Sequence, residues 1–439
     1  MWNSVRHRVA SIAIVSISIC GANAQAQADD AVSLAIAGVE PKVTEWRRDI
    51  HQHPELSNQE FRTSRLVAAH LKKLGLEVTT GVARTGVVGV LRGTLPGPVI
   101  ALRADMDALP VTEPAGLPFA SKERVKLPTG ETGVMHACGH DAHTAMLMGA
   151  AEVLAGMRSQ LSGTVKFIFQ PAEEALPDGP RSGSALMIDQ GVLRDDPVPT
   201  AIFGIHVMPS DAGTVSFRSR GTMAAGDAFT IAVKGVQTHG AQPWRGVDPI
   251  TVSAQILTAL QMIPSRQLDV TTAPAVITIG SIHGGVRPNI IPEHVEMHGA
   301  LRTFDVAMRD DVLARIDRTA RAVAESAGAT AEVTVTPYAP VTYNDPDLTR
   351  QLVPAMERAA GRGKVREARL VMGSEDFSRY AQAIPGLFVF LGINKVGVPE
   401  GSAAENHSPH FFVNEDALVT GVRALVFVTL DYLGGANDH

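Results

Sequence analysis

The chain has 439 residues, 45% of them hydrophobic, and its 45 acidic side chains outnumber 39 basic ones to give a formal net charge of −6. A length well beyond that of a single core predicts two domains or one elaborated large domain. The composition is that of a globular enzyme rather than an integral membrane protein, and the acidic balance favours neither nucleic acid nor anionic lipid as a partner.

The N-terminus is predicted to be a secretory signal peptide. Arg6 and Arg8 precede an uncharged run over residues 9–19, which is too short to span a bilayer, and small residues lead to an Ala-x-Ala pattern at Ala26–Ala28. An uncleaved membrane anchor is the alternative. Cleavage would leave a net charge of −8 and a single cysteine, Cys138. We therefore expect an exported protein, periplasmic or secreted, without an intrachain disulfide and without membrane attachment.

Two helices and two strands are expected to open the mature chain, over residues 32–56, 63–74, 86–91 and 99–103. The second strand runs into Asp105 and Asp107. Ligands of open α/β sheets bind at the carboxyl ends of the strands, so these two aspartates are candidates to contact a ligand or to orient a metal ligand. A turn-forming pair beside Pro110 is the alternative.

The stretch Met135–His143 holds three histidines, a cysteine and an aspartate within nine residues. Cys138 and His140, two apart, can face one cavity, and thiolate with imidazole suits cations such as Zn²⁺. A buried cysteine beside helix-capping polar residues is the alternative. Because a lone thiol is a liability in an oxidising compartment unless it is buried or metal-bound, the cysteine count favours Cys138 as a ligand.

Two later strands, expected over residues 163–170 and 201–205, also run into residues of ligand type. Glu173 and Glu174 follow the first strand and His206 follows the second. A solvated loop and a structural histidine are the alternatives. Since three strands now bring such residues to one edge of a sheet, we expect a metal site there, with both an anionic ligand and a base.

Residues 217–336 are predicted to form an inserted α+β domain. Its expected strands cover residues 228–234, 275–279, 294–301 and 331–336, and its helices cover 249–262 and 307–327. After it the main domain resumes with a helix over 349–360, a strand over 387–391 and a helix over 415–433. The predicted organisation is thus a signal peptide over 1–28, a catalytic domain from 29–216 and 337–439, and the insert.

Separated motifs resemble those of the M20 metallopeptidases, specifically the amidohydrolase branch of N-acyl-amino-acid, hippurate and auxin-conjugate hydrolases. The matching blocks are Arg103–Pro110, Met135–His143, Gln170–Glu174, Gly204–His206, His239–Pro243, Gly373–Phe377 and His407–Pro409. Blocks in this order across nearly the whole mature chain are highly specific. The resemblance implies an α/β fold with two domains, in which a zinc-peptidase-like catalytic domain carries a four-strand, two-helix dimerisation or lid domain.

The resemblance also implies a metal centre. Two divalent ions, Zn, Mn or Co, with a bridging water between them would be held by Cys138, His140, Glu174, His206 and His407. Glu173 would be the general base that takes a proton from this water and hands it to the leaving amine. Asp105 stands where other branches of the family carry a metal histidine, so Asp105 and Asp107 would orient ligands. Asp141 is expected to orient a ligand or to cap the following helix, and His136 and His143 to make supporting hydrogen bonds.

Three residues of the predicted insert have implied roles in substrate binding and catalysis. His239 would stabilise the oxyanion, and in this family the histidine reaches the site from a partner subunit, which implies a homodimer through the insert. Asn289 and Arg302 resemble the residues with which members of the family bind the substrate's free carboxylate. For Arg302, the alternative is an exposed cation at the end of a strand.

Two departures from the family pattern lie near the presumed pocket. The loop over residues 175–184 is longer than a short Gly-rich turn, and Trp244 stands where a histidine is common. Trp244 either stacks on an aromatic acyl group or packs within the insert, and packing is slightly favoured. Both departures bear on the preferred acyl group.

The sequence predicts an exported, metal-dependent amidohydrolase that cleaves the amide bond of N-acyl amino acids or short peptides, of the aminoacylase, carboxypeptidase or hippurate-hydrolase type. An exported binding protein for a small acid, without catalysis, is the alternative. The full set of metal ligands with a base favours the enzyme, because a binding protein has no physical reason to assemble it.

Overall fold

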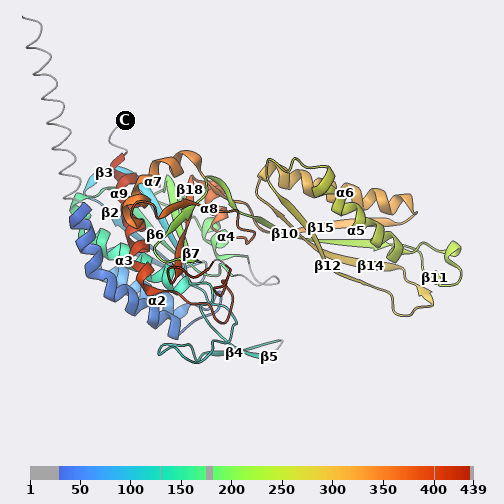
Figure 1. Cartoon of the computed structure of the whole chain (residues 1–439), viewed down its shortest axis with the longest axis horizontal. Helices are drawn as coiled ribbons and strands as arrows, with labels where there is room; N and C mark the ends of the chain where they lie inside the picture. Colours follow the sequence, from blue (N-terminus) through green and yellow to red (C-terminus); the bar gives the residue numbers. More distant parts are fainter. Residues whose placement is uncertain (1–28, 129, 175–180, 400, 436–439) are drawn as a thin grey trace, which may run out of the picture.

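The computed structural model describes residues 29–128, 130–174, 181–399 and 401–435. The predicted signal peptide and most of the long loop after Glu174 lie outside the described residues. The described chain forms two lobes, a larger one around a mixed sheet and a smaller one that projects from it (Figure 1). The predicted fold class is confirmed: it is a two-domain α/β fold with a small α+β insert.

An eight-stranded sheet forms the centre of the larger lobe. In spatial order its strands are β1 (Glu77–Val82), β2 (Gly86–Arg92), β6 (Ser162–Gln170), β3 (Leu95–Asp105), β7 (Ala201–Asp211), β18 (Gly386–Asn394), β8 (Val215–Phe217) and β17 (Val365–Glu367). The central strands β6, β3, β7 and β18 are parallel to one another. Their carboxyl ends therefore meet at one edge, where the polar motifs follow.

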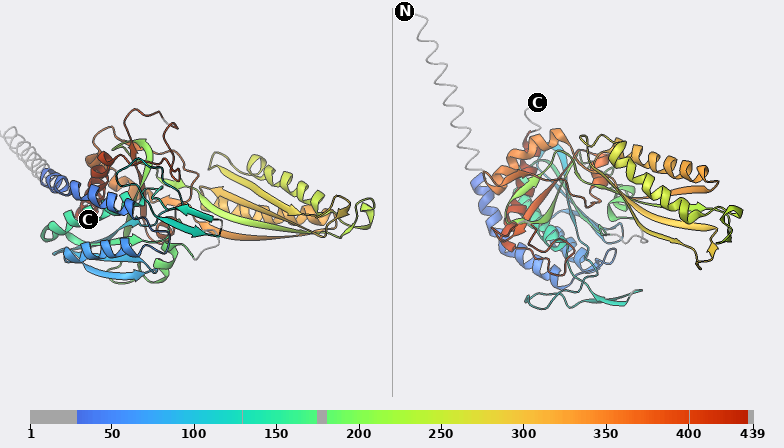
Figure 2. Two further views of the ribbon diagram at one scale, coloured as in Figure 1. Left: turned by 90° about the horizontal axis from the view of Figure 1, so that it is seen from below. Right: turned by 45° about the vertical axis from the view of Figure 1, so that its right-hand side comes forward.

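Helices cover both faces of this sheet (Figures 1 and 2). One face is covered by a helix over residues 29–52 and by α2 (Phe61–Lys73), α3 (His140–Gly156), α7 (Pro346–Ala360) and α9 (Leu418–Gly435), and the other by α4 (Gly183–Asp189) and α8 (Ser378–Ala383). Strand β18 shows how the layers are filled, because Leu387 and Val389 join the core under the first set while Phe388 and Phe390 join the other.

Helix α9 belongs to the core. The stretch Glu415–Gly434 is long and apolar enough to cross a membrane, with a mean hydropathy of 1.5 over 18 residues, but 61% of those residues are buried inside the protein. Its buried side chains, such as Leu425 and Phe427, pack in the same cluster as those of α3 and α7. Burial against other helices explains its apolar composition.

The smaller lobe has its own core. Its antiparallel sheet has the order β12 (Ala275–Gly284), β14 (His294–Thr303), β10 (Ala225–Lys234) and β15 (Thr330–Ala339), and α5 (Pro249–Arg266) and α6 (Val306–Ser326) lie along one face (Figure 1). Ile231, Ile256 and Ile316 join strand and helices in a cluster separate from the main core. The limits at residues 217 and 336 stay a prediction.

Short elements complete the described chain. They are β4 (Arg124–Leu127), β5 (Gly130–Gly133), β9 (Arg220–Met223), β11 (Thr238–His239), β13 (Ile290–Ile291), β16 (Thr342–Asn344), η1 (Arg158–Gln160), η2 (Pro243–Arg245) and η3 (Glu415–Ala417). Strands β9 and β16 pair where the chain enters and leaves the smaller lobe. Strands β11 and β13 pair at the far tip of that lobe (Figure 1).

The expected ends of two elements are wrong. Strand β7 does not stop at Ile205 but continues to Asp211, so His206 lies within the strand. The pairing of β7 with β3 ends earlier, at Arg103 and Gly204. At His206, β7 therefore has no paired residue of β3 beside it. The first helix ends at residue 52 instead of 56, in keeping with the exclusion of helical backbone before Pro54.

Candidate metal centre

The residue after Cys138 sets the geometry of the central motif. Gly139 precedes α3 with φ of +92°, a left-handed conformation that favours glycine. A Cβ at this position would lie 2.2 Å from Val207 Cγ2, so a side chain has no room. This close approach brings the motif against β7, and the Cys138 Sγ atom lies 3.4 Å from His206 Nε2.

In both histidines of this group Nε2 is the ring nitrogen on the side of the candidate metal centre, where His206 Nε2 meets the Cys138 thiol. His206 Nδ1 lies 2.8 Å from the Val207 carbonyl oxygen and therefore donates to it. His140 Nδ1 lies 3.3 Å from Asp107 Oδ1, and His140 Nε2 is buried without a hydrogen-bond partner. Potential ligand atoms of Cys138, His140 and His206 all lie within 4.8 Å of one another. An orphaned imidazole nitrogen beside a thiol is the arrangement that a metal ion would satisfy.

A second group of ligand atoms shares the same thiol. Cys138, Glu174 and His407 also lie within 4.8 Å of one another, and His407 Nε2 is 2.9 Å from Glu174 Oε1. His407 has φ of +71°, and the preceding Asn406 donates to the Cys138 carbonyl oxygen at 3.2 Å. The structure thus brings together all five residues predicted as metal ligands, in two groups that meet at Cys138.

Asp107 and Asp105 support these groups from behind. Asp107 accepts hydrogen bonds from the backbone N–H groups of Glu173 and Glu174, at 3.1 and 2.9 Å. Asp105 Oδ1 lies 2.6 Å from His143 Nδ1, and His143 Nε2 accepts from the Val207 N–H at 2.8 Å. The aspartates therefore fix ring and backbone orientations around the candidate metal centre, as carboxylates near a metal site commonly do.

The charges in this region fit a divalent cation. Burial raises the pKa of the Cys138 thiol well above its usual range, and the negative charges of Glu174 and Glu173 raise it further. Burial opposes a charge on His140, yet Asp105 and Asp107 outweigh it and raise its pKa to about 10. The surrounding negative charges thus favour a positive charge at this position. A thiolate at Cys138 would add a further negative charge, which a bound metal ion would have to balance.

Glu173 is buried beside two carboxylates that we did not predict to be part of the site. Carboxylate oxygens of Glu173, Glu375 and Asp376 lie within 4.8 Å of one another. The fully buried Arg103 guanidinium donates to Asp376 at 2.9 Å and to Asp105 at 2.6 Å, and it forms an ion pair with Glu375 at 2.9 Å. Burial, with the charge of Glu375, raises the pKa of Glu173 well above its usual range. The Gly373–Phe377 block carried this acidic pair, but spacing alone did not place it near Glu173.

These groups open into a cleft of 950 Å³ between the two lobes. Its walls include Cys138, Glu173 and His407 from the larger lobe and Arg302 and Tyr338 from the smaller one. Arg302 Nη1 donates to the Ser374 hydroxyl across the cleft. The cleft is large enough for a small acylated amino acid or short peptide.

Two other predicted residues do not lie at this cleft. His239 and Asn289 are both exposed at the tip of the smaller lobe, where Gly240 N donates to the Asn289 carbonyl oxygen at 2.8 Å. Trp244 in η2 is 76% exposed, so the expectation that it packs within the insert is wrong.

Two expectations around α3 are also wrong. Both ring nitrogens of His136 are buried without a hydrogen-bond partner, so it makes none of the expected supporting contacts. Asp141 Oδ2 accepts from Arg47 Nε at 2.7 Å and lies 2.9 Å from His51 Nδ1. Within the described residues, no hydrogen bond or ion pair joins Asp141 to a predicted ligand. Its negative charge instead balances the buried Arg47.

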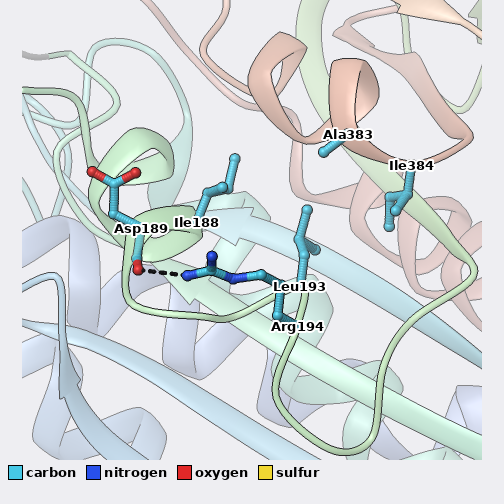
Figure 3. A pocket seen from close by; sticks show the side chains of 6 residues that line it. All are labelled: Ile188, Asp189, Leu193, Arg194, Ala383 and Ile384. Carbon is cyan, nitrogen blue, oxygen red and sulfur yellow. Dashed lines mark hydrogen bonds between the residues drawn. The ribbon is translucent and has the colours of Figure 1, made fainter.

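A smaller cavity lies apart from this site, between the ends of α4 and α8 (Figure 3). It has a volume of 410 Å³ and a mostly apolar lining that includes Ile188, Leu193 and Ile384. Arg194 at its rim donates to the Asp189 carbonyl oxygen at 3.0 Å. Its described lining contains no histidine or cysteine, so it is not a second metal centre of the same kind.

The sequence pattern of peptidase family M20/M25/M40 matches residues 101–430, and the chain belongs to this family. It is therefore a metal-dependent hydrolase of amide or peptide bonds, in agreement with the predicted family and class of enzyme.

Relatives of known name match nearly the whole chain. Thermostable carboxypeptidase 2 of Saccharolobus solfataricus is 41% identical over 397 residues, which cover 90% of this chain and 96% of that one. N-acetylcysteine deacetylase of Bacillus subtilis is 39% identical over 380 residues, covering 86% and 93%. The crystal structure of the Bacillus subtilis YXEP protein, described as a dinuclear metal-binding peptidase of the M20 family, matches with a TM-score of 0.74 and 35% identity over 91% of this chain and 99% of that one.

Proposed function

We propose that the protein is an exported amidohydrolase that releases the amino acid from N-acyl amino acids or short peptides with a free carboxylate. The observation that carries this proposal is the shared cleft, in which Glu173 and the ligand-type residues face Arg302 on the opposite wall. The relatives' names, a carboxypeptidase and an N-acetylcysteine deacetylase, support the same substrate class.

Two divalent ions, Zn, Mn or Co, would be held by the two groups of ligand atoms. One group is Cys138, His140 and His206, and the other is Cys138, Glu174 and His407. When bound, such ions supply Lewis acidity, which polarises a carbonyl and lowers the pKa of water to about 7.

Glu173 would carry the protons of the reaction. Its carboxylate is buried next to the predicted ligands, where it can take a proton from the attacking water and then give it to the leaving amine. Asp376 N, 3.4 Å from Glu173 Oε1, helps to fix the carboxyl group. Arg302 would bind the substrate carboxylate, for which its guanidinium is geometrically suited.

His239 and Asn289 would act in the cleft of a second copy. Their exposure at the tip leaves them outside their own cleft, and the proposed homodimer through the inserted domain would bring the tip to the partner's site. There the His239 imidazole would donate a hydrogen bond to the oxyanion that forms on the scissile carbonyl.

Hydrolysis of a panel of N-acyl amino acids and dipeptides, with defined metals, tests the proposal. We expect release of the free amino acid, complete loss of activity after chelation, and recovery with Zn²⁺, Mn²⁺ or Co²⁺. Substrates with an amidated carboxyl end serve as controls and should react poorly. Tight binding of the panel without turnover under any metal would instead favour the alternative, a binding protein for small acids.

A further inference from the structure

The turn before helix α2 is joined to the candidate metal centre by two hydrogen bonds. Ser57 Oγ donates to Asp107 Oδ2 at 2.6 Å. Glu60, the residue that precedes α2, accepts at Oε1 from the backbone N–H of Ala172 at 2.9 Å. These contacts connect a turn near the N-terminus to the segment that carries Glu173, more than a hundred residues later in the chain.

Ala172 has an unusual backbone conformation. Its φ of +50° lies in the left-handed region, which alanine rarely adopts and which needs support from neighbouring groups. Three successive N–H groups are held there by buried carboxylates, because Glu60 accepts from Ala172 and Asp107 accepts from Glu173 and Glu174. The direction in which Glu173 leaves the backbone depends on this bend.

Burial of the Glu60 carboxyl group costs free energy, which indicates that this group has a specific role. It is fully buried, and its two oxygens accept from the N–H groups of Asn58 and Ala172 and from the Thr85 hydroxyl. Within the part of the chain that the structure describes, Glu60 forms no ion pair with a cation. Burial and the charge of Asp107 raise its pKa to about 7, so an uncharged side chain of the same shape is a fair substitute.

We propose that Glu60 is a positioning residue of the hydrolytic reaction: it holds the Ala172 amide and thereby aims Glu173 into the cleft. The inference rests on the proposed function, in which Glu173 moves the protons. Glu60 does not line the described cleft, and it acts on the reaction through the backbone of residues 172–174.

Variants of the mature full-length enzyme test this role. Glu60→Ala removes the acceptor, and we expect kcat to fall by about ten- to a hundredfold, with KM and metal content close to those of the wild type. Hydrogen exchange of the amides of residues 172–174 should become faster. Glu60→Gln keeps an oxygen that can accept from Ala172, so it should restore both kcat and slow exchange. Glu60→Asp, whose carboxylate is too short to reach, should behave like the alanine variant and replaces it if that variant does not fold.

Glu55 offers a matched control. Its carboxylate accepts from the N–H groups of Arg62 and Thr63 at the start of α2 and forms no hydrogen bond with residues 172–174. Glu55→Ala should lower stability without the loss of kcat. The inference would be overturned if Glu60→Ala kept the kcat and the amide exchange of the wild type. It would also be overturned if Glu60→Gln were as impaired as Glu60→Ala. If the wild type hydrolyses nothing, the proposed function fails, and amide exchange alone then decides whether Glu60 holds the bend.

Discussion

The candidate metal centre and the tip of the smaller lobe both carry residues with predicted catalytic roles, but their surroundings differ. Cys138 and His140 are buried, and the carboxylates of Asp105 and Asp107 fix the groups around them. His239 and Asn289 are exposed, and the side chain of His239 accepts only a hydrogen bond from Ala241 N, two residues away. A buried and supported site is ready for a ligand within one chain, whereas an exposed tip needs another surface to complete it.

One chain by itself therefore holds only part of the proposed catalytic machinery. The cleft holds the candidate base and the predicted metal ligands, and Arg302 reaches it from the smaller lobe. The donor proposed for the oxyanion is absent from the described lining of the same cleft. Variants at the candidate metal centre and at the tip should therefore have different effects on activity.

The largest expected effect concerns the tip. His239→Ala should lower kcat by about a hundred- to a thousandfold with unchanged metal content, because an oxyanion donor is lost. Co-expression of this variant with Glu173→Gln should restore about a quarter of the wild-type activity, since half of randomly paired dimers would carry one complete site. Steady-state kinetics of the purified mixture measure the recovery. Two inactive variants that stay inactive together would show that the tip does not act across subunits.

A smaller effect is expected at the opposite wall of the cleft. Arg302→Ala should raise KM by about tenfold or more for substrates with a free carboxylate, because a charge-assisted contact is lost, and should change KM little for amidated ones. Ser374→Ala is the control, since it removes the partner of Arg302 in the free protein but not the guanidinium. Equal effects on both kinds of substrate would contradict a carboxylate-binding role.

The smallest expected effect concerns Trp244. If the tip enters a partner's cleft, its exposed indole is available to stack on an aromatic acyl group. Trp244→Ala should then lower kcat/KM for N-benzoyl relative to N-acetyl amino acids by about two- to tenfold, and Trp244→Phe should retain most of the preference. An unchanged ratio in competition assays would place Trp244 outside the acyl pocket.

Much of the fold and of the candidate site could be predicted from local sequence signals. Apolar strands that run into Asp105, Glu173 and Glu174 are visible without a structure, and parallel strands must bring these residues to one edge. The unpaired cysteine in Met135–His143 likewise pointed to a ligand. These predictions depend on residues close together in the chain and on the regular geometry of a sheet.

Contacts between distant segments could not be predicted in this way. The bond from Ala172 to Glu60, and the ion pairs of Arg103 with Glu375 and Asp376, join residues more than a hundred positions apart. In the sequence, these buried charged residues cannot be distinguished from charged residues that are exposed to solvent. The exposure of Trp244 was missed for the converse reason, because a large apolar side chain normally predicts burial.

The central claim is that Glu173 moves protons at a metal centre that the chain's own residues build. Glu173→Gln keeps the size of the side chain and removes its ability to accept a proton, so metal content and kcat measured together on this one variant test the claim most directly. We predict as many bound ions per chain as in the wild type and a kcat lower by at least about a hundredfold. Wild-type turnover with the ions in place would contradict the account.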